Sequence, residues 1–192
     1  MYTTKRRLRA HGPCVGGWKK FRAAHRGVGD TEPISYLSIL DSNGLYDTFW
    51  ALRVAAPEGE RDRFCRLLAC DYAEHVLPIW EAAYPEDRRP HEAIAVARRY
   101  ARGEATAAEL EEAASGAQRA ASKEQRSPAA AAAATCATAR AAEWAVPVAA
   151  LAASRAAMAA AERSWQEQRL REALTSGWPG AYPGVRVEIE NP

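Results

Sequence analysis

The alanine content of the chain restricts its fold more strongly than any other feature of the sequence. Alanine fills 44 of the 192 positions, whereas phenylalanine occurs three times and methionine twice. Because alanine is the best helix former and a poor strand former, the composition disfavours an architecture built on sheets. We therefore expect an all-α protein, with enough residues for one ordinary domain and a hydrophobic core.

Capping residues, prolines and glycines divide the sequence into about eight predicted helices. Pro33 and Pro57 each suit the first position of a helix, and Pro78 should kink the long helix that begins at Pro57. Thr106 followed by Glu109 forms a capping box, which predicts the start of another helix.

One helical domain is expected over residues 1–177, followed by an extended tail over 178–192. Apolar and polar residues alternate from 185 to 190, as in a half-buried strand, so strand is expected in this tail and nowhere else. A single strand is not stable by itself, so an ordered tail must pair with another part of the chain.

Large side chains recur every seven residues in the alanine-rich C-terminal part, at Trp144, Leu151, Met158 and Trp165. This spacing places them on one stripe of the C-terminal helices, where small alanines allow neighbouring helices to approach closely. An extended homodimeric coiled coil is the alternative, but Pro147 interrupts the heptads that it needs. We therefore expect the stripe to be buried within the molecule.

The charges of the chain are distributed unevenly. Residues 1–29 contain eight basic side chains and no acidic one, while the remainder contains 18 basic and 24 acidic side chains, for a net charge of +2. The spacing of Trp18 and Phe21 predicts a buried helix face, so the neighbouring cations should point outward, towards an anionic partner. The candidates for partner binding are Lys19, Lys20, Arg22 and Arg26.

Two alternative roles for this basic segment stay open. The segment can follow a nucleic-acid backbone, although Trp18 and Phe21 have the spacing of a buried face and not of a stacking platform. It can also pair within the chain, for which the acidic run at 104–112 is a candidate. A protein partner is the preferred interpretation and nucleic acid the weaker one.

The densest polar group of the sequence consists of Asp71, Glu74 and His75, which are weak candidates for catalytic residues. A metal site would need a third ligand, such as His91 or Glu92, and the sequence has no HExxH motif. An ion pair between Asp71 and His75, which are four residues apart on one helix, is the simpler interpretation.

Motifs that would identify an enzyme are missing from the sequence. It contains no GxSxG nucleophile motif, no Walker phosphate loop and no GxGxxG motif, so we expect no cofactor and no metal. The four cysteines form no CxxC pair, which favours reduced thiols in a cytoplasmic protein. We also expect neither a membrane span nor a signal peptide.

A protein that sequesters a small molecule between helices is a rival interpretation, as is an undescribed helical enzyme with its site between helices. Aromatic side chains would form the walls of such a binding site. The candidate lining residues are Trp18, Trp50, Trp80, Trp144 and Trp165.

Three short motifs resemble those of a known bacterial family. They are AE-x-VLPI-x-E at 73–81, a YP-x-D turn at 84–87 and RP-x-x-AI at 89–94, and three of their prolines fall at set distances among apolar residues. The chain resembles the immunity-five-like family, which comprises alanine-rich helical immunity proteins of polymorphic toxin systems. The similarity spans most of residues 8–175 and includes a closing block at 162–166.

The resemblance implies a non-enzymatic cytoplasmic protein that binds a cognate toxin and neutralises it. Immunity proteins against nuclease toxins tend to be acidic, because they cover a site built to hold phosphate. With its net charge of +2, this chain is not expected to oppose a basic nuclease unless its acidic two-thirds forms the interface.

Overall fold

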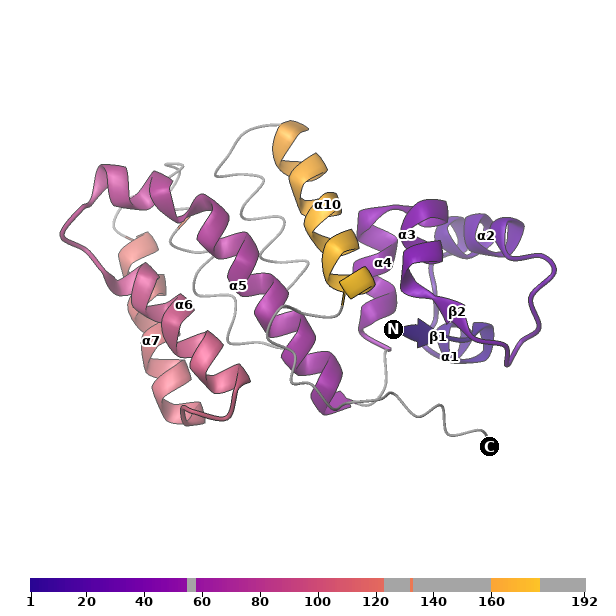
Figure 1. Cartoon of the computed structure of the whole chain (residues 1–192), viewed down its shortest axis with the longest axis horizontal. Helices are drawn as coiled ribbons and strands as arrows, with labels where there is room; N and C mark the ends of the chain where they lie inside the picture. Colours follow the sequence, from indigo (N-terminus) through magenta and orange to yellow (C-terminus); the bar gives the residue numbers. More distant parts are fainter. Residues whose placement is uncertain (55–57, 123–131, 133–159, 177–192) are drawn as a thin grey trace. The chain divides into compact units, whose positions relative to one another are not determined.

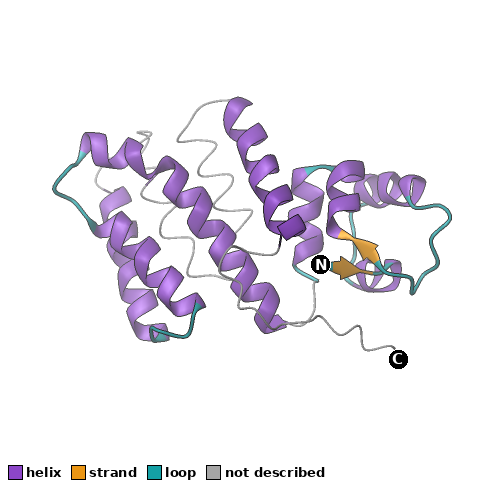
Figure 2. Cartoon of the chain, viewed as in Figure 1, coloured by secondary structure: helices purple, strands orange, loops and turns teal. Residues whose placement is uncertain are grey.

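The computed structural model of the chain describes residues 1–54, 58–122, 132 and 160–176. Within these residues it contains eight helices and one two-stranded sheet, which confirms the expected all-α class (Figures 1 and 2). The helices are α1 (Lys5–Ala10), α2 (Val15–Ala24), α3 (Tyr36–Asn43), α4 (Leu45–Leu52), α5 (Glu58–Ala83), α6 (Arg89–Ala101), α7 (Ala107–Ala121) and α10 (Ala160–Ser176). The strands are β1 (Tyr2–Thr3) and β2 (Ile34–Ser35).

The described residues form two compact units. The first contains residues 1–54 and 169–176, and the second contains residues 58–122, 132 and 160–168. The tail over 178–192, with its expected strand, lies outside the described residues, and the domain limits inferred from the sequence stay predictions.

The first unit contains strand where none was expected. β1 and β2 pair antiparallel, with Tyr2 opposite Ser35 and Thr3 opposite Ile34, so the restriction of strand to the C-terminal tail is wrong. Pro33 does not open a helix either, because Ile34 is buried in this pairing and α3 begins after it. The Ser35 side chain caps α3 by accepting from the backbone N–H of Ser38 at 3.1 Å.

A buried lysine ties α1 to the loop that follows α2. Thr4 caps α1, and the ammonium of Lys5 on its first turn donates to the backbone carbonyls of His25, at 2.6 Å, and Val28. Only 8% of Lys5 is exposed, so these carbonyls replace the water that a buried ammonium would otherwise lose. The segment that returns from α2 towards β2 is thereby held against α1.

The second unit is organised around the 26-residue helix α5. Its buried side chains include Leu68, Tyr72 and Trp80, and the indole N–H of Trp80 donates to the Asp87 carbonyl at 2.8 Å. Pro78 lies inside the helix, and the last turns of α5 run at an angle to the rest in Figure 1, in line with the expected kink.

Helices α6 and α7 also belong to this unit, with α6 packed against both α5 and α7 (Figure 1). The expected capping box of Thr106 and Glu109 is present at the start of α7, and the hydrogen bond from the Thr106 backbone lowers the pKa of the Glu109 carboxyl. The buried face of α7 consists largely of small residues, which let its backbone approach its neighbours closely. They include Ala114, Gly116, Ala117, Ala120 and Ala121.

Most of the heptad stripe expected in the C-terminal part is not described. Trp144, Leu151 and Met158 lie outside the described residues, and their burial stays a prediction. Trp165, on α10, is half-buried and packs edge-on against Tyr72, with 5.8 Å between the ring centroids.

The close packing of α7 gives a stability prediction. Ala117 is fully buried, so Ala117→Leu adds methylenes to a filled space and should destabilise the protein by about 1–3 kcal/mol. Ala108→Leu, at an exposed position of the same helix, is the control and should change the free energy of unfolding by less than about 0.5 kcal/mol. Urea denaturation followed by circular dichroism measures both, and equal midpoints would show that the α7 face is not tightly packed.

Candidate functional site

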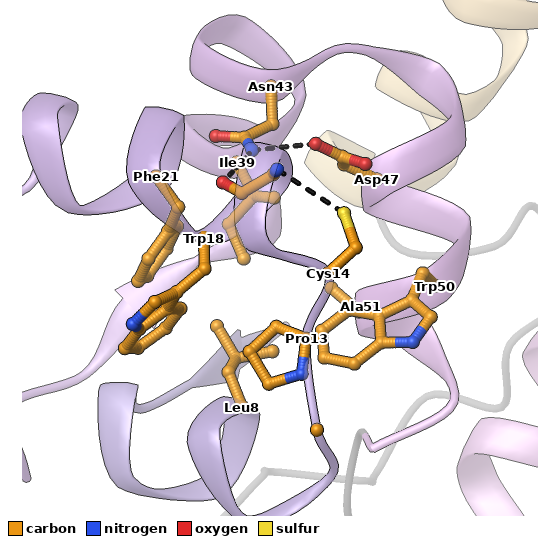
Figure 3. Close-up of a pocket in the computed structure, with 12 residues that line it drawn as sticks. Leu8, Pro13, Cys14, Trp18, Phe21, Ile39, Asn43, Asp47, Trp50 and Ala51 are labelled. Carbon is orange, nitrogen blue, oxygen red and sulfur yellow. Dashed lines mark hydrogen bonds between the residues drawn. The ribbon is translucent and has the colours of Figure 1, made fainter.

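A pocket of about 280 Å³ lies in the first unit, between the end of α1, α2, α3 and α4. Figure 3 shows Trp18 and Phe21 on one side of it and Trp50 on the other. The two α2 rings stack, with 5.4 Å between their centroids, and so form one continuous aromatic wall. The apolar lining consists of Leu8, Pro13, Trp18, Phe21, Ile39, Trp50 and Ala51.

The start of α2 explains how the sequence builds this wall. The Cys14 side chain caps the helix by accepting from the backbone N–H of Gly17 at 3.3 Å. Residues 14, 17, 18 and 21 then share one helix face, because helical residues three and four apart are neighbours. The two aromatic side chains therefore point to the same side as the cap.

One end of the pocket is polar and is held together by Asn43. Its side-chain amide donates to the Gly17 carbonyl at 2.9 Å and to Asp47 Oδ2 at 2.7 Å (Figure 3). Its side-chain oxygen accepts from the Ser42 hydroxyl at 3.0 Å. Asn43 is the last residue of α3 and Asp47 lies in the first turn of α4, so this one amide connects three helices.

Two glycines make this arrangement possible. Gly44 separates α3 from α4 with a φ of 87°, in the left-handed region that disfavours other residues. Gly17 lies so close to Asp47 that a Cβ atom there would come within 2.9 Å of Asp47 Oδ2 and 3.1 Å of Cys14 Sγ. The polar end of the pocket therefore depends on the absence of a side chain at position 17.

The four predicted partner-binding residues are all exposed, as expected. Lys19, Lys20 and Arg22 lie on α2, and Arg26 follows it. None of the four makes an ion pair with another described residue, and Lys20 donates to the Asn43 carbonyl at 3.2 Å. The acidic run at 104–112 instead forms ion pairs close in sequence, Glu104 with Arg102 and Glu109 with Arg99.

The sequence also indicated the polar cluster of Asp71, Glu74 and His75 on α5. These residues make contacts that differ from the expected ones. Asp71 and His75 do not pair with each other. An arginine of α6, Arg98, lies 2.8 Å from Asp71 Oδ1 and 2.6 Å from Glu74 Oε2. A guanidinium that reaches both carboxylates from a neighbouring helix binds them better than a histidine four residues along the same helix. This arrangement joins α5 to α6.

His75 instead contacts side chains of α10. Its Nε2 lies 3.0 Å from Glu162 Oε2, and its ring stacks on Trp165 with 3.7 Å between centroids and 7° between planes. The Glu162 side chain is only 1% exposed, and its other oxygen accepts from Gln166 Nε2 at 2.8 Å. Glu162 was missed as a partner, although its block was among the motifs of the resemblance.

The candidate tryptophans do not form one site. Trp18 and Trp50 line the pocket, whereas Trp80 is enclosed in the core of the second unit and Trp165 covers His75. Trp144 lies outside the described residues. The pocket residues that the sequence did not indicate, Asn43 and Asp47, lie next to the Gly44 turn, and nothing in their spacing relates them to α2.

The described residues contain no group of three or more histidines, cysteines, aspartates or glutamates that could hold a metal ion. No described helix has the length and apolar character to cross a membrane.

A scan against family models matched residues 62–173 to the Imm-5 like putative immunity protein family. This range covers more than half of the chain. The chain belongs to this family. No curated protein and no solved structure matched the chain significantly.

The residues of the Imm-5 like match include one candidate site and leave out the other. The match contains the contacts of His75 and Arg98, together with most of α5 and all of α6 and α7. The pocket and the exposed cations of α2 lie before residue 62, in a part of the chain that the Imm-5 like model does not cover.

The buried carboxylate of the Imm-5 like segment gives a second prediction. His75→Ala leaves Glu162 buried without its imidazole partner and should cost roughly 1–3 kcal/mol in the free energy of unfolding. His91→Ala, which removes a half-buried histidine on α6, should cost less than about 0.5 kcal/mol. Chemical denaturation compares the two, and equal losses would mean that the Glu162 contact does not stabilise the fold.

The cysteines give a third prediction. Burial raises the pKa of both Cys65 and Cys70 to about 12, so at pH 8 almost all of each thiol is protonated and unreactive, while Cys14 is exposed. In a Cys136→Ser background, a thiol reagent should modify one cysteine quickly in the folded protein. Adding Cys14→Ser should remove this fast phase, and a fast phase that persists would contradict the burial of the other two.

Proposed function

We propose that this chain is an immunity protein that binds one protein toxin and blocks it by direct contact. The observation that carries the proposal is the family match over residues 62–173, which covers α6, α7 and most of α5. The contacts of the α5 cluster favour a binding protein over an enzyme. Asp71 and Glu74 are held by Arg98, so both carboxylates serve the packing of α5 against α6.

The toxin-binding surface that we propose is the outward face of α2. Lys19, Lys20 and Arg22 are exposed there and Arg26 is exposed just after the helix, and no described acidic residue neutralises these four. Charges of one sign on a surface accelerate association with a complementary surface and disfavour partners of the same sign. We therefore infer that the toxin presents an acidic surface at this contact, which fits poorly with the phosphate-binding site of a basic nuclease.

The experiment tests protection from the protein encoded beside this chain in its genome. That neighbouring protein is expressed from an inducible promoter in a susceptible bacterium, with or without this chain. We expect growth arrest without the chain and normal growth with it, together with a complex of the two purified proteins. Arrest that the chain does not relieve, or protection without a complex, contradicts neutralisation by direct contact.

Charge reversal tests the proposed surface. The triple variant Lys19→Glu, Lys20→Glu and Arg22→Glu should keep its melting temperature, because these side chains are exposed, but should weaken toxin binding at least about tenfold at low salt. The difference in toxin affinity between the variant and the unchanged chain should decrease as salt is added, because ions screen exposed charges.

The matched control reverses three exposed arginines within the family match, Arg88→Glu, Arg102→Glu and Arg119→Glu. It changes the net charge equally and should leave toxin binding within about twofold, because these three arginines do not belong to the proposed surface. If the control weakens binding and the α2 variant does not, the toxin contacts the second unit and the basic face is not the interface.

A further inference from the structure

The volume of the first-unit pocket limits what can occupy it. Small-molecule and cofactor sites usually enclose about 300–1,000 Å³, and this pocket of about 280 Å³ falls just below that range. Its walls are the rings of Trp18, Phe21 and Trp50. A space of this size with aromatic walls suits one large apolar side chain, of the kind that anchors a protein interface.

The Asn43 amide and the Cys14 sulfur, at the polar end of the pocket, have already formed hydrogen bonds within the protein. Asn43 Nδ2 donates to both Gly17 and Asp47, and its oxygen accepts from Ser42. The Cys14 sulfur accepts from the Gly17 N–H. A nucleobase needs partners for the donors and acceptors along its edge, whereas an apolar side chain needs none. This lining therefore favours an uncharged, apolar occupant.

The inside of the pocket and its rim carry charges of opposite sign. Asp47 is the one ionisable carboxylate among the lining residues, so an anionic group inside the pocket would be repelled. At the rim, the Lys20 ammonium lies 3.2 Å from the Asn43 carbonyl, and the Arg9 guanidinium lies 5.8 Å from the centre of the Trp18 ring. Arg9 also pairs with Asp30, so Lys20 is the rim cation that no described carboxylate neutralises.

We propose that this pocket receives one uncharged aromatic or large aliphatic side chain from an acidic segment of a partner protein, one of whose carboxylates lies against Lys20. The inference rests on the proposed function for the identity of that partner as a toxin. The chemistry of the pocket can be tested without a toxin. The pocket lies outside the family match, so the family does not account for it.

The probes are short fluorescent peptides rich in aspartate and glutamate, with tryptophan, leucine or alanine at the centre. A lysine-rich peptide with a central tryptophan and a single-stranded DNA of similar length are the comparisons. Anisotropy titrations with the full chain should show binding of the acidic tryptophan and leucine peptides tighter than about 1 mM. The alanine peptide should bind at least about tenfold more weakly, and the lysine-rich peptide should not bind.

Two variants locate the binding on the protein. Trp50→Ala removes one wall of the pocket and should weaken binding of the tryptophan peptide about tenfold, whereas Tyr46→Ala, exposed on the same helix and not in the lining, should leave it unchanged. Lys20→Glu should weaken binding by a similar factor at low salt, and Arg119→Glu, with the same charge change in the second unit, should not.

Several results would overturn the proposal. These are no binding of either anchored peptide at about 1 mM, equal binding of the alanine peptide, and tighter binding of the DNA than of any peptide. The alanine peptide tests the anchor without altering the protein, so a Trp50→Ala variant that fails to fold does not prevent a decision. If the peptides do not bind but the chain still protects against the toxin, the proposal for the pocket is wrong and the proposed function stands. If the peptides bind but the chain does not protect against the toxin, the pocket binds acidic segments and its partner is not that toxin.

Discussion

The first unit depends on the side-chain amide of Asn43, which joins three helices with two hydrogen bonds. One bond reaches the Gly17 carbonyl on α2 and the other the Asp47 carboxylate on α4, while Asn43 itself ends α3. A hydrophobic contact fixes no direction, whereas an amide that donates to two acceptors fixes the positions of both. The aromatic walls of the pocket keep their separation because the helices that carry them meet at this amide.

The second unit is held together by different means. Alanines on α7 allow close packing, and two polar contacts bind the other helices to α5, through Arg98 on α6 and Glu162 on α10. Burial removes the Glu162 carboxylate from water, which is costly, so its contact with His75 offsets that cost more than it adds net stability. Apolar packing supplies most of the stability, and the charged groups fix which faces meet.

Local structure could be predicted well from the sequence. The capping box at Thr106 and the long helix α5 follow from short-range signals, and both are present. The outward direction of the α2 cations followed in the same way, because the pair of Trp18 and Phe21 defines the buried side of that helix. The family was also identified from motifs within a few dozen residues of each other.

Contacts between distant residues could not be predicted in this way. β1 pairs with β2 across some 30 residues, and His75 meets Glu162 far along the chain, although Asp71 is four residues away. A local rule ranks the near partner first, but the packing of helices decides which partner is in reach. For the same reason the sequence predicted only some of the pocket residues. Trp18 and Trp50 were candidates, whereas Asn43 and Asp47 were not.

The close approach at Gly17 has a consequence for how this surface can change over evolution. A Cβ atom there would come within 2.9 Å of Asp47 Oδ2, so any larger residue at position 17 would displace the carboxylate that accepts from Asn43. The exposed cations Lys19, Arg22 and Arg26 carry no such restriction and can be exchanged one at a time. A lineage that must follow a changing partner would therefore diversify first at these exposed cations and keep glycine at position 17.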